Sequence, residues 1–170
     1  MERGLVHIYT GDGKGKTTAA FGLAARCAGY GKKVIVYQFL KSMPTGELIS
    51  CKKLGIDVIR TAPTDKFWFS MTDDEKELTK SETERALEHI FDSECDMLIL
   101  DEIICTADLG IIRTERLIDI IKSKPLETEL ILTGRNMPSD LENYADYISE
   151  IRCIKHPYSQ NINAREGIDF

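Results

Sequence analysis

Short apolar runs rich in β-branched residues alternate along the chain with stretches in which apolar residues recur every three or four positions. Almost wholly apolar runs, such as 97–100, are typical of strands that are covered on both faces. The alternation predicts an α/β fold with a mostly parallel central sheet of about six strands flanked by helices. The predicted strands are residues 5–9, 33–39, 56–60, 97–100, 129–133 and 147–151.

Polar residues at fixed spacing predict where some of the intervening helices begin. Thr72 followed by Glu75, and Ser139 followed by Glu142, both have the spacing of a capping box. Thr114 precedes an apolar stripe of helical spacing. We therefore expect helices that start near these three positions.

Two segments are irregular. Residues 41–69 contain prolines and glycines but little periodicity, and residues 155–170 combine aromatic and basic side chains without a helical pattern. In α/β folds, long connections at the carboxyl edge of the sheet usually carry the site, so the first is a candidate site loop and the second a candidate flap. The chain shows neither an internal repeat nor a low-complexity linker, so residues 1–170 are expected to form a single domain.

Charge and cysteine content narrow the function classes. The 170 residues include 28 acidic and 22 basic side chains, and a net charge of -6 repels a phosphate backbone, so no nucleic-acid partner is expected. The five cysteines are scattered and never spaced C-x-x-C, which argues against a disulfide framework or a zinc site and favours small apolar packing roles in a reducing cytoplasm. No apolar run approaches the roughly 20 residues that span a bilayer, and the N-terminus lacks a signal-peptide core, so no membrane association is expected.

A glycine-rich loop follows the first predicted strand directly and precedes a helix-prone run. Such a loop cradles phosphate with its backbone N–H groups and with the start of the helix, so the whole loop is predicted to bind phosphate. Lys16 would supply a charge to the phosphate chain, and the Thr17 hydroxyl can ligate Mg²⁺. The strict pattern has glycine at position 10, so Thr10 marks a variant loop. The loop residues are Thr10, Gly11, Asp12, Gly13, Lys14, Gly15, Lys16, Thr17 and Thr18.

Charged and polar residues also follow other predicted strands. Asp101 and Glu102 end the fourth strand, where a carboxylate can reach a metal ion beside the phosphate loop; the alternative is an acid that merely caps the next helix. Arg135 follows the fifth strand, and Gln38 and Lys41 lie at the end of the second. Because the carboxyl ends of parallel strands share one edge, these three are predicted to lie beside the phosphate loop, with simple surface exposure as the alternative.

Several blocks occur in order from one end of the chain to the other. Besides the loop they are Gln38-Phe39-Leu40-Lys41, Thr45-Gly46-Glu47, Leu100-Asp101-Glu102, Leu132-Thr133-Gly134-Arg135, Ala145-Asp146, Lys155-His156-Pro157-Tyr158 and the ending from Ala164 to Phe170. Together they resemble the ATP:corrinoid adenosyltransferases of the CobA/BtuR type. The loop with Thr10 and the two blocks of the tail are the most specific parts of this resemblance.

The resemblance implies a RecA-like P-loop NTPase fold and an unusual reaction. The 5'-deoxyadenosyl group of ATP would pass to the cobalt of a reduced corrinoid, and inorganic triphosphate would leave, in adenosylcobalamin synthesis or salvage. Members of the family bind ATP in the reverse direction relative to P-loop hydrolases. By the same resemblance Lys16, Thr17 and Glu102 are catalytic, and Thr17, Asp101 and Glu102 hold Mg²⁺ or Mn²⁺.

An aromatic run matches a further feature of the family, in which a Phe-x-Trp pair displaces the lower cobalt ligand. Phe67 matches the first aromatic, Phe69 stands where Trp is common, and Trp68 lies between them. We predict Phe67 and Phe69 as the catalytic wedge, on an extended segment that turns Trp68 to the opposite side. Simple packing of the run beneath the loop is the alternative. Asn161 replaces a common Gly, and since Asn tolerates a positive φ the turn is expected to survive.

The resemblance also implies partners. A flavoprotein would reduce the corrinoid, and a homodimer is suggested by analogy with longer members, whose N-terminal helix, expected to be missing here, covers the nucleotide of a partner subunit. Two other functions share the loop and the acidic strand end. One is a small metabolite kinase, which transfers only the γ-phosphate, and the other is an ATP-dependent switch or binding module.

Overall fold

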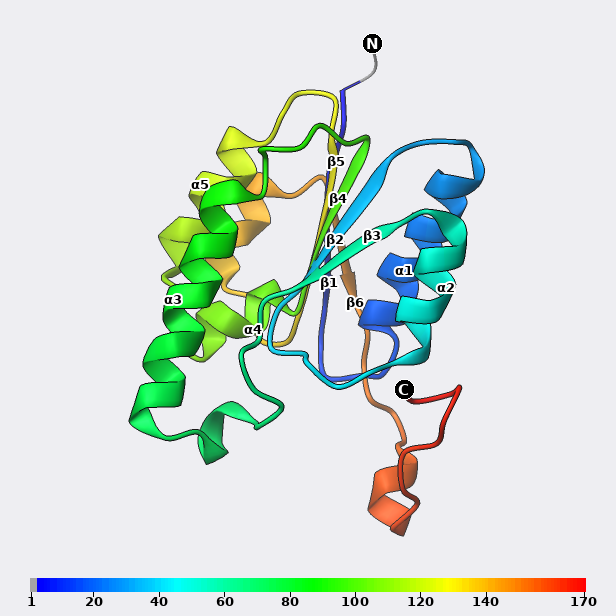
Figure 1. The fold of residues 1–170 in the computed structure, drawn as a ribbon, viewed down its shortest axis with the longest axis vertical. Coiled ribbons are helices and arrows are strands. Elements are labelled where there is room, and N and C mark those ends of the chain that lie inside the picture. Colours follow the sequence, from blue (N-terminus) through cyan, green and yellow to red (C-terminus); the bar gives the residue numbers. More distant parts are fainter. Residues whose placement is uncertain (1–2) are drawn as a thin grey trace.

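A computed structural model describes residues 3–170 around a six-stranded sheet of strand order β3-β2-β4-β5-β1-β6 (Figure 1). Every pair of neighbouring strands is parallel. Each predicted strand is present, and its ends lie within one residue of the predicted ones. The strands are β1 (Val6–Thr10), β2 (Val34–Gln38), β3 (Asp57–Arg60), β4 (Met97–Asp101), β5 (Glu129–Thr133) and β6 (Tyr147–Glu150).

Helices cover both faces of the sheet, which confirms the α/β class. Figure 1 shows α1 and α2 on one side and α3, α4 and α5 on the other. The bounds are α1 (Lys16–Gly29), α2 (Gly46–Leu54), α3 (Asp73–His89), α4 (Ile103–Asp108) and α5 (Thr114–Ser123), with short 3-10 helices η1 (Trp68–Ser70), η2 (Ser139–Tyr144) and η3 (Pro157–Gln160). None of the helices within residues 3–170 is both long and apolar enough to cross a membrane.

The packing of β4 explains why residues 97–100 are all apolar. Alternate side chains of a strand point to opposite faces. Leu98 and Leu100 enter the apolar layer beneath α4 and α5, whereas Met97 and Ile99 enter the layer that contains Ala20 of α1. All five residues of the strand are buried, as expected for a central parallel strand.

The predicted helix starts have different outcomes. The capping box at Thr72 is confirmed, since its side chain accepts the Glu75 N–H and the Glu75 carboxylate accepts the Thr72 N–H at 2.8 Å. The capping box at Ser139 is wrong, because Pro138 holds the cap position of a 3-10 helix that has no side-chain cap. The wholly buried Leu141 anchors that short turn. Thr114 is the first residue of α5 rather than its cap.

The tail follows β6 at the carboxyl end of the sheet, where the phosphate loop also lies (Figure 1). Its 3-10 helix is η3, and Asn161 directly after that helix has φ +57°. The prediction that Asn161 preserves a turn with positive φ is therefore confirmed. The tail returns toward α2, where the backbone of Phe170 approaches Gly46.

Candidate active site

The glycine-rich loop joins β1 to α1, the connection that the sequence predicts. Thr10 still belongs to β1, where it pairs with Glu150 of β6, and its φ is not positive. A β-branched residue suits this strand position, so a glycine is not needed there. Gly15, in contrast, has φ +125° immediately before α1, a conformation that side chains rarely adopt.

The back of the loop packs against the chain that leaves β6. The Gly13 N–H donates to the Ile151 carbonyl at 2.8 Å, so this amide is engaged within the protein. A Cβ on Gly11 or Gly13 would meet the same carbonyl oxygen at 2.4 or 2.7 Å. The Cys153 N–H donates to Asp12 Oδ1 at 3.0 Å, and this bond lowers the pKa of the Asp12 carboxyl. Both glycines are thus required for a close approach of two backbones.

The two lysines of the loop have different partners. Lys16 Nζ is buried and donates to the Gly13 carbonyl at 2.8 Å; burial lowers the Lys16 pKa, and the charge of Glu102 opposes that shift. Lys14 Nζ donates instead to the tail, to Asp169 Oδ1 at 2.5 Å and to the Ile168 carbonyl at 3.1 Å. Asp169 is a neighbour of the loop that sequence reasoning missed.

Asp101 is the centre of the site, with a side chain that is 0% exposed. Its Oδ1 accepts from the Thr17 hydroxyl at 2.9 Å and from the Thr133 hydroxyl at 2.7 Å. Its Oδ2 accepts from Gln38 Nε2 at 3.1 Å and from Lys41 Nζ at 2.7 Å. The structure therefore brings together the loop, the acidic strand end and the two polar residues at the end of β2, and the alternative that Gln38 and Lys41 are merely exposed is wrong.

Glu102 stands next to Asp101 in a left-handed conformation, with φ +64°. Its N–H donates to the Thr133 hydroxyl at 2.9 Å, and its carboxylate accepts from the Cys105 thiol at 2.9 Å. Glu102 holds the N-cap position of α4 but makes no side-chain cap, so the carboxylate is not used for helix capping. A left-handed, non-glycine residue costs about 1–2 kcal/mol and is typical of a functional site.

Cys105 corrects the interpretation of the cysteines as apolar filling. Besides donating to Glu102, its sulfur accepts the Arg135 N–H at 3.2 Å. Burial, followed by the charge of Glu102, raises the pKa of the Cys105 thiol to about 12. Cys153 is exposed, and all five cysteines are free thiols.

Arg135 lies within electrostatic reach of the loop. Its charge lowers the pKa of Lys16 and of Asp12, but its side chain is exposed. Gly134, just before it, has φ +151° and packs so closely on α4 that a Cβ would lie 2.7 Å from Ile104 Cβ. This packing places Arg135 at the rim of the site.

Arg60, the last residue of β3, is a further neighbour that sequence reasoning missed. Its Nε donates to Gln38 Oε1 at 2.9 Å, and its other nitrogens donate to the Met43 carbonyl and to the Thr45 hydroxyl. Arg60 thereby leaves the Gln38 NH₂ group to face Asp101. The position of Arg60 at a strand end was its only signal in the sequence.

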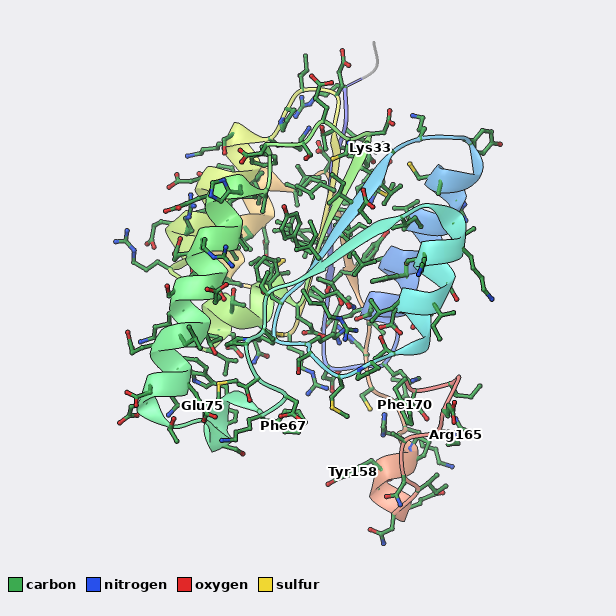
Figure 2. The ribbon with its side chains drawn as sticks, in the orientation of Figure 1. Lys33, Phe67, Glu75, Tyr158, Arg165 and Phe170 are labelled. Atoms are coloured by element: carbon green, nitrogen blue, oxygen red, sulfur yellow. The ribbon has the colours of Figure 1, made fainter. Side chains whose placement is uncertain are left out.

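The aromatic run lies at the same end of the molecule but outside the Asp101 cluster. Phe67 and Phe69 are 84% and 86% exposed, whereas Trp68 packs against the apolar core and lies 5.8 Å from Lys76 Nζ. The expected extended segment is wrong, because residues 68–70 form η1. Figure 2 shows Phe67 on one side of this end and Tyr158 of the tail on the other.

The donor set at the Asp101 cluster fits a divalent hard cation. Thr17, Asp101 and Glu102 offer one hydroxyl and two carboxylates. Within residues 3–170, no group of three or more His, Cys, Asp or Glu side chains could hold a metal ion. A site of one or two carboxylates beside a phosphate loop suits Mg²⁺, whose remaining ligands are usually water and substrate phosphates.

Comparison with known proteins gives consistent results over almost the entire chain. Residues 2–170 match the family model of the ATP:corrinoid adenosyltransferases BtuR/CobO/CobP. The corrinoid adenosyltransferase of Escherichia coli strain K12 is 34% identical over an alignment of 171 positions, which covers 99% of this chain and 87% of that protein. Corrinoid adenosyltransferase CobA of Salmonella typhimurium is 34% identical with the same coverage, and a Sinorhizobium corrinoid adenosyltransferase is 36% identical over 99% of this chain and 81% of its own.

Proposed function

Since the chain belongs to the ATP:corrinoid adenosyltransferase family, we propose that it transfers the 5'-deoxyadenosyl group of ATP to the cobalt of a reduced corrinoid. Inorganic triphosphate is the second product. The observation that carries the proposal is the contact between Thr17 of the phosphate loop and Asp101 of β4, in a chain that matches the family over residues 2–170. ATP and a corrinoid are the two substrates.

The leaving group determines which charge the phosphate loop must stabilise. The whole triphosphate departs from C5', so negative charge grows at its α-phosphate end. Lys16 and the first N–H groups of α1, which have no intrahelical acceptors, stabilise that charge. Lys16 now donates to the Gly13 carbonyl and turns from it to the phosphates when ATP binds. The other loop residues, Lys41 and Arg135 surround the same nucleotide, and Gln38 lies behind them, buried against Asp101.

Thr17, Asp101 and Glu102 would hold the divalent cation, Mg²⁺ or Mn²⁺. Such an ion neutralises charge on the departing triphosphate. The protein's contribution is to orient its donors: Thr133 and Gln38 fix the Asp101 carboxylate, and Cys105 fixes that of Glu102. Glu102 thus has one carboxylate oxygen held by the thiol and the other turned toward Lys41.

The corrinoid would bind where Phe67 and Phe69 are exposed. Two aromatic side chains that are largely exposed to solvent add little to the packing of the fold. Their exposure supports a role in contacting a large, flat, apolar ligand. There they would displace the lower ligand of cobalt and so ease its reduction by a flavoprotein. The packing of Trp68 against the core supports leaving it out of this wedge.

Three further points belong to the proposal. One sheet-centred domain carries both substrate sites, and the assembly is a homodimer, by analogy with longer members of the family. The five free thiols support a reducing, cytoplasmic location.

Anaerobic incubation of the protein with MgATP and chemically reduced cob(I)alamin tests the function. We expect adenosylcobalamin and inorganic triphosphate in equal amounts. Protein heated to unfolding is the matched control for uncatalysed alkylation. Formation of ADP and a phosphorylated metabolite without a Co–C bond would identify a kinase instead, and slow release of phosphate alone would identify an ATP-dependent switch.

A further inference from the structure

The ammonium group of Lys41 lies among the three oxygens that the proposed function assigns to a divalent cation. Lys41 Nζ is 3.0 Å from Thr17 Oγ1, 2.7 Å from Asp101 Oδ2 and 3.9 Å from Glu102 Oε1. We propose that Lys41 is a built-in cation, which occupies the metal position of the nucleotide-free protein and must leave it when a divalent ion is loaded. The inference rests on the proposed metal site but not on the identity of the second substrate.

The backbone after β2 is shaped to deliver Lys41 to this place. Phe39 is completely buried, and its N–H donates to the Asp101 carbonyl at 2.9 Å, which ties the chain to the end of β4. Leu40 then adopts φ +57°, a strained conformation for a residue with a branched side chain. This turn brings the next residue back over the site instead of away from it. The strain persists because the anchored Phe39 and the Lys41 ion pair hold both sides of it.

The buried carboxylate of Asp101 explains why a cation is needed at this position. An ionised carboxylate removed from water is costly unless it is paired and hydrogen-bonded. Thr17, Thr133 and Gln38 donate hydrogen bonds to it but carry no charge. In the part of the chain that the structure describes, Lys41 is the cationic side chain within ion-pair distance of Asp101.

An ammonium and a divalent ion cannot share these oxygens, because each would lie within a few ångströms of another positive charge. Loading must therefore exchange one cation for the other. Asp101 keeps a positive partner before and after the exchange, so the site never holds an uncompensated buried acid. The displaced ammonium stays on the loop that borders the nucleotide, where it adds a positive charge toward the phosphates.

Binding of Mn²⁺ alone to the nucleotide-free protein, followed by electron paramagnetic resonance, tests the exchange. The set is wild type, Lys41→Met, Lys41→Gln, Lys41→Arg and, as the matched control, Lys14→Met. Lys14 lies on the neighbouring phosphate loop and its variant removes the same charge, but its ammonium is paired with Asp169 and not with Asp101. Lys41→Gln keeps a hydrogen-bond donor for Asp101, so the test stands on this variant should Lys41→Met fail to fold.

We expect the two neutral Lys41 variants to bind Mn²⁺ about tenfold more tightly or better, since one like charge at contact distance is removed. Lys41→Arg should bind as weakly as wild type, and Lys14→Met should differ from it by no more than about twofold because exposed charges are screened. Equal or weaker binding of Mn²⁺ by folded Lys41→Gln would overturn the proposal, as would an equal gain in Lys14→Met. No corrinoid enters this measurement, so its result stands apart from the outcome of the transfer assay.

Discussion

Lys14 of the phosphate loop donates a hydrogen bond of 2.5 Å to Asp169, a residue that lies 155 positions later in the chain. The same carboxylate accepts the Arg165 N–H at 2.9 Å. One acidic side chain therefore closes the tail upon itself and ties it to the loop. Figure 2 shows Arg165 and Phe170 close together at this end of the molecule.

Replacing Asp169 by Asn should release the tail while leaving the fold intact. Exposed ion pairs contribute no more than about 1 kcal/mol, so the unfolding temperature should hardly change. Limited trypsin digestion should cut after Lys155 and Arg165 several times faster than in wild type. Glu166→Gln, which removes the same charge from an exposed neighbour, is the control. Equal cleavage of the two variants would show that the pair does not hold the tail.

The same contact has a defined pH dependence. The hydrogen bond from Lys14, and next the one from the Arg165 N–H, lower the pKa of Asp169 to about 2. Because Asp169 has a lower pKa in the folded protein than its ordinary carboxyl value, near 3.9, the contact is fully formed above that value. It is lost as pH falls toward 2. Protection of the tail should therefore persist at pH 4, measured by hydrogen exchange of tail amides, and disappear between about pH 4 and pH 2.

Lys16→Ala should abolish adenosyl transfer and weaken ATP binding. Losing a charge-assisted hydrogen bond costs about 1.5–3 kcal/mol in binding, and more in a transition state that gathers charge at the phosphates. Equilibrium binding of ATP and single-turnover rates measure the two effects. Lys33→Ala is the control, because Figure 2 places Lys33 at the opposite end of the sheet. Wild-type turnover by Lys16→Ala would remove the loop from the chemistry.

Substitutions in the aromatic run should separate reduction from alkyl transfer. Phe67→Ser and Phe69→Ser should lose activity with cob(II)alamin and a flavoprotein reductant but keep most of it with cob(I)alamin. Both side chains are exposed, so the free energy of unfolding should change by less than about 0.5 kcal/mol. Trp68→Ala should instead destabilise the protein by about 1–3 kcal/mol, because Trp68 packs against the core. A reduction-specific defect in Trp68→Ala alone would place the wedge at Trp68.

Two glycines of the same region should respond oppositely to alanine. A Cβ on Gly13 would lie 2.7 Å from the Ile151 carbonyl oxygen and 2.8 Å from that of Arg152, so Gly13→Ala should destabilise by about 1–3 kcal/mol. Gly22 lies within α1 with open space around it, and Gly22→Ala should stabilise by about 0.5–1 kcal/mol. Urea unfolding measures both. A neutral Gly13→Ala would mean that the loop can move away from Ile151 without cost.

Cys105 should resist alkylation although it is only partly buried. With a thiol pKa of about 12, roughly one Cys105 in ten thousand is ionised at pH 8, and the thiolate is the reactive form. Iodoacetamide at pH 8 should modify the exposed Cys153 first, and the Cys105 rate should rise tenfold per pH unit up to about 12. Peptide mass spectrometry follows both sites. Early modification of Cys105 would show that its hydrogen bond to Glu102 is broken in solution.

The sequence by itself was sufficient for the framework of the fold. Each strand is a local apolar run, and the loop between β1 and α1 is built from consecutive residues. Both can therefore be recognised from a short stretch of sequence. The carboxyl ends of parallel strands must share one edge, so Asp101, Gln38 and Lys41 could be brought near the loop without knowledge of the strand order.

Only the tertiary structure decided which partners complete the site. Strand β1 lies between β5 and β6, so the chain that leaves β6 packs behind the loop and explains Gly11 and Gly13. Arg60 reaches Asp101 through Gln38, and Asp169 reaches Lys14 across nearly the full length of the chain. These contacts join residues far apart in sequence, and no local periodicity encodes them. They follow from the crossover order of the sheet and from the need of each buried polar group for a partner.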